Sequence, residues 1–94
     1  MFSKVRFEWD PAKNAVNEAK HGISLAAAAA LWEGPVVSIP SVRAGEERHL
    51  AIGVIGGKYW TVIYAPRADH LRLISARRSR DNEKTLHQDH FPQS

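Results

Sequence analysis

The chain has 94 residues, 44% hydrophobic and 24% charged, and carries a formal net charge of +3 with a pI of about 9.6. This composition excludes a disordered chain, and the length predicts one domain over residues 1–94, because so short a chain rarely builds two cores. The absence of cysteine excludes disulfide scaffolds and thiolate zinc sites. The lack of a signal-peptide core at the start, and of any apolar run near the ~20 residues of a membrane span, predicts a cytoplasmic protein with no membrane partner.

The first third of the chain predicts a strand followed by two helices. Alternating apolar residues indicate a strand over residues 4–9. Asp10-Pro11 is typical of a helix N-cap and first turn, and Gly22 suits the end of that helix. Its apolar positions recur at helical spacing beside a polar stripe of Lys13, Asn17 and Lys20. Ser24 begins a second helix that runs to about Trp32 with almost no polar face, so we expect it to be packed on several sides.

The remaining segments predict a sheet closed by a helix. A short strand at residues 36–39 is expected at a sheet edge or to stop early, because Pro40 follows it. Residues 41–46 read as a polar loop, residues 47–55 and 58–65 as a hairpin through Gly56-Gly57, and residues 70–78 as a further strand. Ser79 caps a last helix that ends near Gln88. The order β-α-α-β-β-β-β-α predicts an α+β fold, with an antiparallel sheet of four to five strands and helices mostly on one face.

Cations crowd the last third of the chain, which makes a polyanion binding surface one interpretation of the charge pattern and a solvated face the other. These cations are Arg67, Arg72, Arg77, Arg78, Arg80 and Lys84. On the strand at residues 70–78, simple alternation places Arg72 and Arg78 on one face and Arg77 on the other. Arginine forks match phosphate oxygens and stabilise charge in phosphoryl transfer. The structural alternative is that one arginine forms an ion pair with Glu47 or Asp81.

Two further clusters combine charged and titratable groups. Lys20-His21 ends the first helix, where cations are stabilised by the helix dipole, but Lys20 could also lie near a scissile phosphate. Alternation places Glu47 and His49 opposite the apolar Leu50 face, so Glu47 is a candidate general base or an ordinary surface residue. The histidines show no tight metal-ligand spacing, and His87 and His90 are expected on a solvated face. We therefore expect neither a metal nor a cofactor.

Three motifs in order resemble the BrnT family of type II toxins, which are similar in fold to RelE-like ribonucleases. The first motif is Phe7-Glu8-Trp9-Asp10 with Lys13, Asn17 and Lys20-His21-Gly22. The second is Gly45-Glu46-Glu47-Arg48 before Leu50-Ala51-Ile52-Gly53. The third is Arg72 with Ile74-Ser75-Ala76-Arg77-Arg78. The resemblance spans most of residues 7–83.

The resemblance implies a metal-independent endoribonuclease that cleaves RNA by 2′-hydroxyl attack. It also implies a BrnA-like antitoxin with a ribbon-helix-helix domain as partner, with promoter DNA bound only through that antitoxin. By motif position, the catalytic candidates are Lys20, Glu47, Arg67, Arg77 and Arg78, and the RNA-binding candidates are Lys13, His21, Arg48, Arg72 and Arg80. This interpretation requires the arginines, Lys20 and Glu47 to converge on one depression. The alternatives are a non-catalytic nucleic-acid-binding module and a protein-interaction domain.

Overall fold

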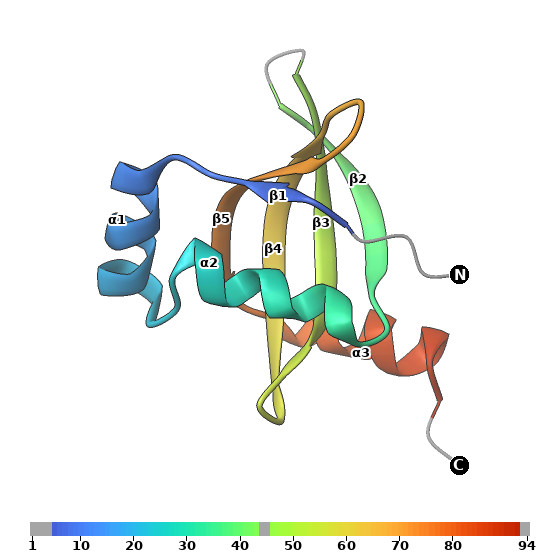
Figure 1. Ribbon diagram of the computed structural model, residues 1–94. Coiled ribbons are helices and arrows are strands. Elements are labelled where there is room, and N and C mark those ends of the chain that lie inside the picture. The colour runs from blue at the N-terminus through green and yellow to red at the C-terminus, as the bar shows by residue number, and fades with distance from the viewer. Residues whose placement is uncertain (1–4, 44–45, 93–94) are drawn as a thin grey trace.

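The computed structural model describes residues 5–43 and 46–92 (Figure 1). The elements follow the predicted order and confirm the α+β class. They are β1 (Phe7–Glu8), α1 (Pro11–His21), α2 (Leu25–Ala28), the 3-10 helix η1 (Ala29–Glu33), β2 (Val37–Arg43), β3 (Glu46–Ile55), β4 (Lys58–Pro66), β5 (Leu71–Arg78) and α3 (Asp81–His90). The second predicted helix is therefore a short α-helix that tightens into a 3-10 helix.

The five strands form one sheet in the order β1-β5-β4-β3-β2. Neighbouring strands from β2 to β5 pair antiparallel, as the hairpin patterns predict. The first strand differs, because β1 pairs parallel with β5, the last strand in the chain. The sheet is thus mixed, and β1 brings the start of the chain beside its last strand.

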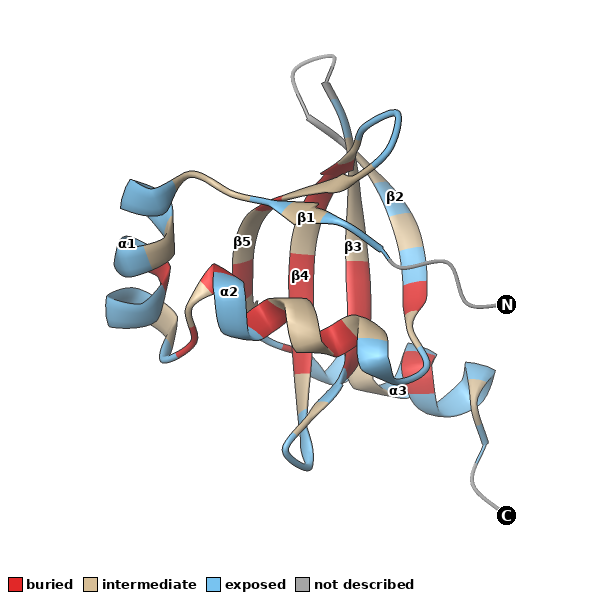
Figure 2. Cartoon of the chain, in the orientation of Figure 1, coloured by how far each residue is buried: buried red, intermediate tan, exposed pale blue. Residues whose placement is uncertain are grey.

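Helical segments lie on both faces of this sheet (Figure 1). The segment α2–η1 covers one face and buries Leu25 and Leu31 against Val62 and Leu73, all of them at most 2% exposed. Figure 2 shows buried segments along α2–η1 and along the middle of the strands behind it. The helix α3 crosses the opposite face, where it contacts β2 and β3. We call this second face the α3 face.

The helix α1 begins and ends as its sequence predicts, but it packs through Asn17 of its polar stripe, whereas Lys13 and Lys20 of that stripe stay exposed. The Asp10 side chain accepts a hydrogen bond of 2.8 Å from the backbone N–H of Ala12, and Gly22 has a φ of 80°. Asn17 is buried, because its amide donates to the carbonyl groups of Ile23 and Ala76 and accepts from the Ala76 N–H. Val16, on the apolar stripe, is 61% exposed. A hydrogen-bond clamp, rather than apolar packing, therefore orients α1.

Two predicted boundaries shift because tertiary contacts override local signals. The strand β2 continues through Pro40 to Arg43 and β3 begins at Glu46, so residues 41–43 and 46 of the predicted loop belong to strands; residues 44 and 45 lie outside the described part of the chain. Proline is tolerated because β2 is an edge strand. Ser79 does not cap α3. Its hydroxyl is buried and shares a 2.8 Å hydrogen bond with Thr61, and α3 begins two residues later.

A bulge in β5 places its last two arginines on faces opposite to those predicted from simple alternation. Ile63 pairs with Ser75 and Tyr64 pairs with Leu73, so Ile74 is an extra residue on β5. Beyond this bulge the alternation is reversed relative to a regular strand. Arg77 therefore joins Arg72 on the α3 face, whereas Arg78 points to the face covered by α2–η1.

A glycine lets η1 pack closely on the sheet. An added Cβ at Gly53 would lie 2.8 Å from Cγ of Leu31, a fully buried side chain. We expect Gly53→Ala to destabilise the protein by about 1–3 kcal/mol, because η1 must move away from β3. Urea denaturation of this variant measures the effect. Gly34→Ala is the control, since an added Cβ there meets no described atom within 4 Å.

Candidate functional site

Two adjoining depressions on the α3 face collect most of the cationic side chains singled out from the sequence. The depressions measure about 360 and 240 Å³ and share Ile74 and Ser75. The larger is also lined by Ser41, Arg48, Leu50, Ile63, Arg77 and Arg80, and the smaller by Lys13, Val16, Asn17, Lys20 and His21. We call the set Lys13, Lys20, His21, Arg48, Arg77 and Arg80 the cationic surface.

Each part of the cationic surface is positioned by a different element. The neighbours of Arg48 along β3 face α2–η1, so Arg48 itself points to the α3 face. Arg77 also points to the α3 face, because of the bulge at Ile74. The Asn17 clamp turns the α1 stripe with Lys13 and Lys20 toward β5. Among the described residues, no carboxylate forms an ion pair with either lysine, so their charge is available to an anionic ligand.

Glu83 holds Arg77 in place at this surface. The two carboxylate oxygens of Glu83 each accept a 2.8 Å hydrogen bond from the Arg77 guanidinium. One of these oxygens also accepts from the Thr61 hydroxyl at 2.9 Å and from the Arg80 backbone N–H at 2.8 Å. Burial of Glu83 raises its pKa, but these hydrogen bonds outweigh burial and hold the pKa at about 2. Arg77 is therefore fixed in direction before any ligand binds.

Sequence reasoning missed Glu83. The sequence left open that one arginine of the last strand forms an ion pair with Glu47 or Asp81. Arg77 does form an ion pair, but its partner is Glu83. The available signal was an acidic residue at the third position of the last helix, where a carboxylate often binds the N-cap N–H.

Glu47 and Arg78 lie on the other side of the sheet from the cationic surface. Glu47 contacts His49 at 3.3 Å, and the His49 ring stacks on Tyr64, a residue of the core beneath α2–η1. Arg78 lies over the Trp60 ring, 5.4 Å from its centroid. The expected convergence of Glu47 and Arg78 with Lys20 and Arg77 is therefore not what the structure shows.

Arg72 and Arg67 also lie apart from the cationic surface. Arg72 forms an ion pair with Glu8 of β1, which also binds His70. The Asp69 hydrogen bond raises the pKa of His70, burial opposes this, and Glu8 adds to the rise. Arg67 is exposed in the turn between β4 and β5 and donates to the Pro66 carbonyl. The contacts of Glu8 with Arg72 and His70 tie β1 to β5 and its preceding turn.

The histidines of α3 differ from expectation in one case. His90 is exposed as predicted, but His87 is only 6% exposed and donates through Nε2 to the Pro35 carbonyl at 3.1 Å. Over residues 5–43 and 46–92, no three His, Cys, Asp or Glu side chains are grouped closely enough to hold a metal ion. No helix in the same part of the chain is long and apolar enough to cross a membrane.

Comparisons with known proteins address the family of the chain. A search among curated proteins gave no match. Residues 9–83 match the model of a family described as the ribonuclease toxin BrnT of type II toxin–antitoxin systems. The match includes α1, the full sheet from β2 to β5, and Glu83. The chain therefore belongs to the BrnT family of ribonuclease toxins.

Proposed function

We propose that this toxin cuts RNA at the cationic surface, without a metal ion, through attack of the substrate's 2′-hydroxyl on the neighbouring phosphate. The observation that carries the proposal is the gathering of six cationic or titratable side chains around Ile74 and Ser75, with Arg77 already oriented by Glu83. Preorganised cations stabilise charge that develops in a transition state and require little rearrangement to do so.

The arginines act on the phosphate. Arg48, Arg77 and Arg80 line the larger depression and supply N–H donors that match phosphate oxygens. In the reaction the O2′–P bond forms and the P–O5′ bond breaks, which leaves a 2′,3′-cyclic phosphate and a 5′-hydroxyl. The negative charge on the non-bridging oxygens of the pentacovalent phosphorus is greatest between these two events, and the three guanidinium groups stabilise it there.

The proton transfers belong to the smaller depression. The 2′-hydroxyl must lose a proton and the leaving 5′-oxygen must gain one. Lys20 and His21 both line this depression, at the end of α1, and amine and imidazole nitrogens are groups that can carry a proton to or from the reacting oxygens. We assign these transfers to Lys20 and His21 rather than to Glu47, whose side chain lies across the sheet.

The donor set of the cationic surface supports a reaction that uses no metal. Hard divalent cations are bound by carboxylate and carbonyl oxygens. Glu83 is a carboxylate in contact with a residue of this surface, and its oxygens already accept four hydrogen bonds. The side chains that line the surface carry the positive charge that a metal would otherwise supply.

Cleavage assays with chelator and matched substrates test this reaction. The purified protein is expected to cut single-stranded RNA in EDTA and to leave a 2′-deoxy strand of the same sequence intact, because that strand lacks the nucleophile. The products should carry a cyclic phosphate. Equal cleavage of the deoxy strand, or loss of activity in EDTA that Mg²⁺ restores, would contradict the mechanism. RNA binding without cleavage would indicate the non-catalytic alternative.

A type II system pairs a toxin with a protein antitoxin. We propose that the antitoxin here is BrnA-like, with a ribbon-helix-helix domain through which the complex binds promoter DNA, and that both proteins are cytoplasmic. Induction of the toxin in bacteria should arrest growth, and co-expression of the neighbouring gene product should relieve the arrest. If that product binds tightly while the free protein neither binds RNA at low salt nor arrests growth, the interaction-domain alternative holds.

A further inference from the structure

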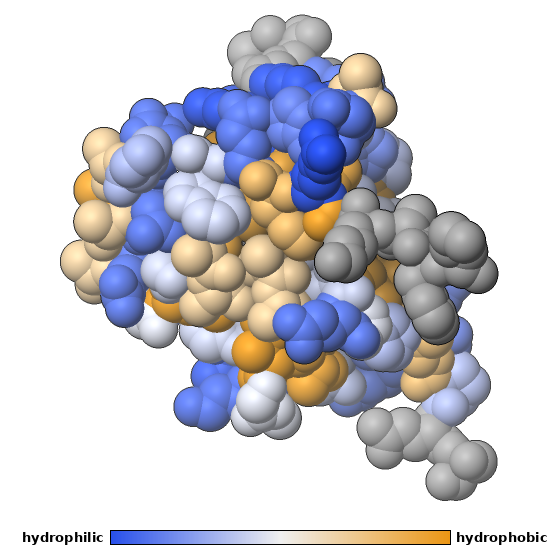
Figure 3. Space-filling view, in the orientation of Figure 1, coloured by the Kyte–Doolittle hydropathy of each residue, from blue (hydrophilic) through white to orange (hydrophobic). Residues whose placement is uncertain are grey.

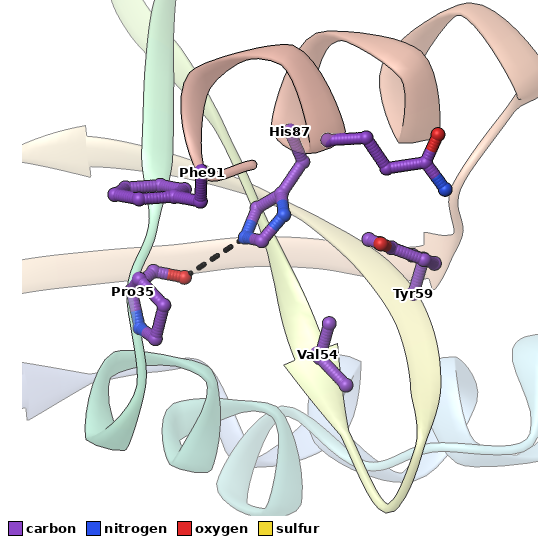
Figure 4. Close-up of a pocket in the computed structure, with 6 residues that line it drawn as sticks. Pro35, Val54, Tyr59, His87 and Phe91 are labelled. Carbon is purple, nitrogen blue, oxygen red and sulfur yellow. Dashed lines mark hydrogen bonds between the residues drawn. The ribbon is translucent and has the colours of Figure 1, made fainter. Parts of the chain in front are cut away.

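A separate pocket lies on the α3 face, at the end of α3 that is farther from the arginines of the cationic surface. It measures about 600 Å³ and is lined by Pro35, Val54, Tyr59, His87, Gln88 and Phe91. Figure 4 shows it between the last turns of α3, the β3–β4 hairpin and the start of β2. We call it the aromatic pocket. Its volume falls in the range of small-ligand sites.

The walls of the aromatic pocket are flat and apolar. The rings of Tyr59 and Phe91 both pack on His87, with centroid separations of 5.4 and 5.0 Å, and Figure 4 shows them on opposite sides of the imidazole. Val54, below them in that view, is 41% exposed although it lies within a strand. Such walls favour a planar ring, which stacks on aromatic side chains or lies flat on an aliphatic one.

Polar groups within the aromatic pocket offer both donors and acceptors. The Pro35 carbonyl can only accept, so Nε2 of His87 carries the hydrogen of their 3.1 Å bond, and Nδ1 of the neutral ring is an acceptor. The Gln88 amide and the Tyr59 hydroxyl each donate and accept. These groups match the edge of a heterocyclic base, whereas an aliphatic side chain would use only the walls.

The helix α3 connects this pocket to the cationic surface. Glu83, which orients Arg77, and His87, which lines the pocket, are four residues apart, a rise of about 6 Å along the helix. Both side chains point toward the sheet, since Glu83 binds Thr61 and His87 contacts Tyr59. A single RNA strand that passes over α3 can therefore place a phosphate at the arginines and another part of the same RNA in the aromatic pocket.

We propose that the aromatic pocket binds one nucleobase of the RNA substrate and sets the base preference of cleavage. The proposal rests on the proposed ribonuclease function. Stacking on the rings supplies affinity, and His87 and Gln88 distinguish bases by the donors and acceptors along their edges. The pocket lies outside the reacting groups, so it selects where the RNA is cut rather than how.

Binding of the four nucleoside 5′-monophosphates, followed by NMR, tests the pocket directly. At least one nucleotide should shift the ring resonances of Tyr59, His87 and Phe91 in a saturable way, and ribose 5-phosphate should not. Val54→Trp should fill the pocket and weaken this binding at least tenfold. Leu86→Trp adds the same ring at an exposed position on α3 that does not line the pocket and should bind as wild type. Gln88→Ala keeps the walls and should change the order of preference among the bases.

Two results would overturn the nucleobase assignment. One is the absence of nucleotide-dependent shifts at these rings. The other is shifts caused only by the antitoxin, which would make the pocket a docking site for a protein side chain.

Cleavage of RNA dinucleotides that differ in one base separates this proposal from the proposed function. Wild-type protein should prefer certain bases, and Val54→Trp should reduce that preference while cleavage still requires the 2′-hydroxyl. If wild type cuts RNA and Val54→Trp keeps the same preference, the pocket proposal is wrong and the reaction stands. If nucleotides bind in the pocket and no RNA is cut, the proposed reaction is wrong. The pocket is then a nucleobase-binding site, and its role in setting a cleavage preference falls with the reaction.

Discussion

Replacing Glu83 with alanine is expected to destabilise the protein by about 3–5 kcal/mol, the usual cost of removing one member of a buried ion pair. The variant leaves the Arg77 side chain, only 19% exposed, without its counter-charge, and also removes the acceptor of the Thr61 hydroxyl and the Arg80 N–H. Urea denaturation at pH 7, with the free energy of unfolding extrapolated to water, measures the loss.

A second acidic residue in the same turn provides the control. Asp81 forms an ion pair with Lys84 at 3.9 Å, but its side chain is fully exposed. Exposed pairs contribute roughly 0–1 kcal/mol, so Asp81→Ala should change stability little. A loss in the Glu83 variant no larger than that in the Asp81 variant would contradict the view that Glu83 anchors α3 and Arg77.

The same carboxylate gives a pH dependence of known sign. The folded state lowers the pKa of Glu83 from 4.5 to about 2, so its contribution to stability is fully present above pH 4.5 and is lost as the pH falls toward 2. A shift of this size corresponds to about 3 kcal/mol. Wild type should therefore lose stability more steeply over this range than Glu83→Gln, which has no proton to gain. Parallel curves would show that Glu83 titrates normally.

The parts of the fold that the sequence predicted are those fixed by local chemistry. The cap at Asp10, the stop at Gly22 and the Gly56-Gly57 hairpin each depend on residues within a few positions of one another. The bulge at Ile74 instead depends on how β5 pairs with β4, which no local pattern shows. It exchanges the faces of Arg77 and Arg78, so the prediction of which arginine shares a face with Arg72 was wrong.

In the candidate site, too, local patterns predicted some features, and contacts between distant elements decided the others. Alternation correctly separated Glu47 from the Leu50 face, but it could not show which face carries the cations. The apolar face of β3 lies under α3, whereas small residues, Ala51 and Gly53, face α2–η1, because Leu31 packs too closely there for larger side chains. Glu83 went unnoticed because its contacts with Thr61 of β4 and Arg77 of β5 depend on how α3 folds back onto these strands, which no local pattern shows.

Two neighbouring residues on β3 give the sharpest test of where the reaction takes place. Arg48 lines the larger depression of the cationic surface, and Glu47 points to the other face with a 77% exposed side chain. Arg48→Ala should lower kcat/KM for RNA about 100-fold, the effect of removing one preorganised donor to a developing charge. Glu47→Ala should stay within a few-fold of wild type. Steady-state cleavage of a short RNA in EDTA measures both.

A conservative variant separates charge from geometry in this test. Arg48→Lys keeps the positive charge but loses the planar fork, so RNA binding should recover more than kcat does. Arg48→Ala should also flatten the salt dependence of RNA binding by about one phosphate contact. If Glu47→Ala instead causes the larger loss, proton transfer takes place on the face covered by α2–η1. The cationic surface would then bind RNA without cutting it, because no carboxylate base can act through the sheet.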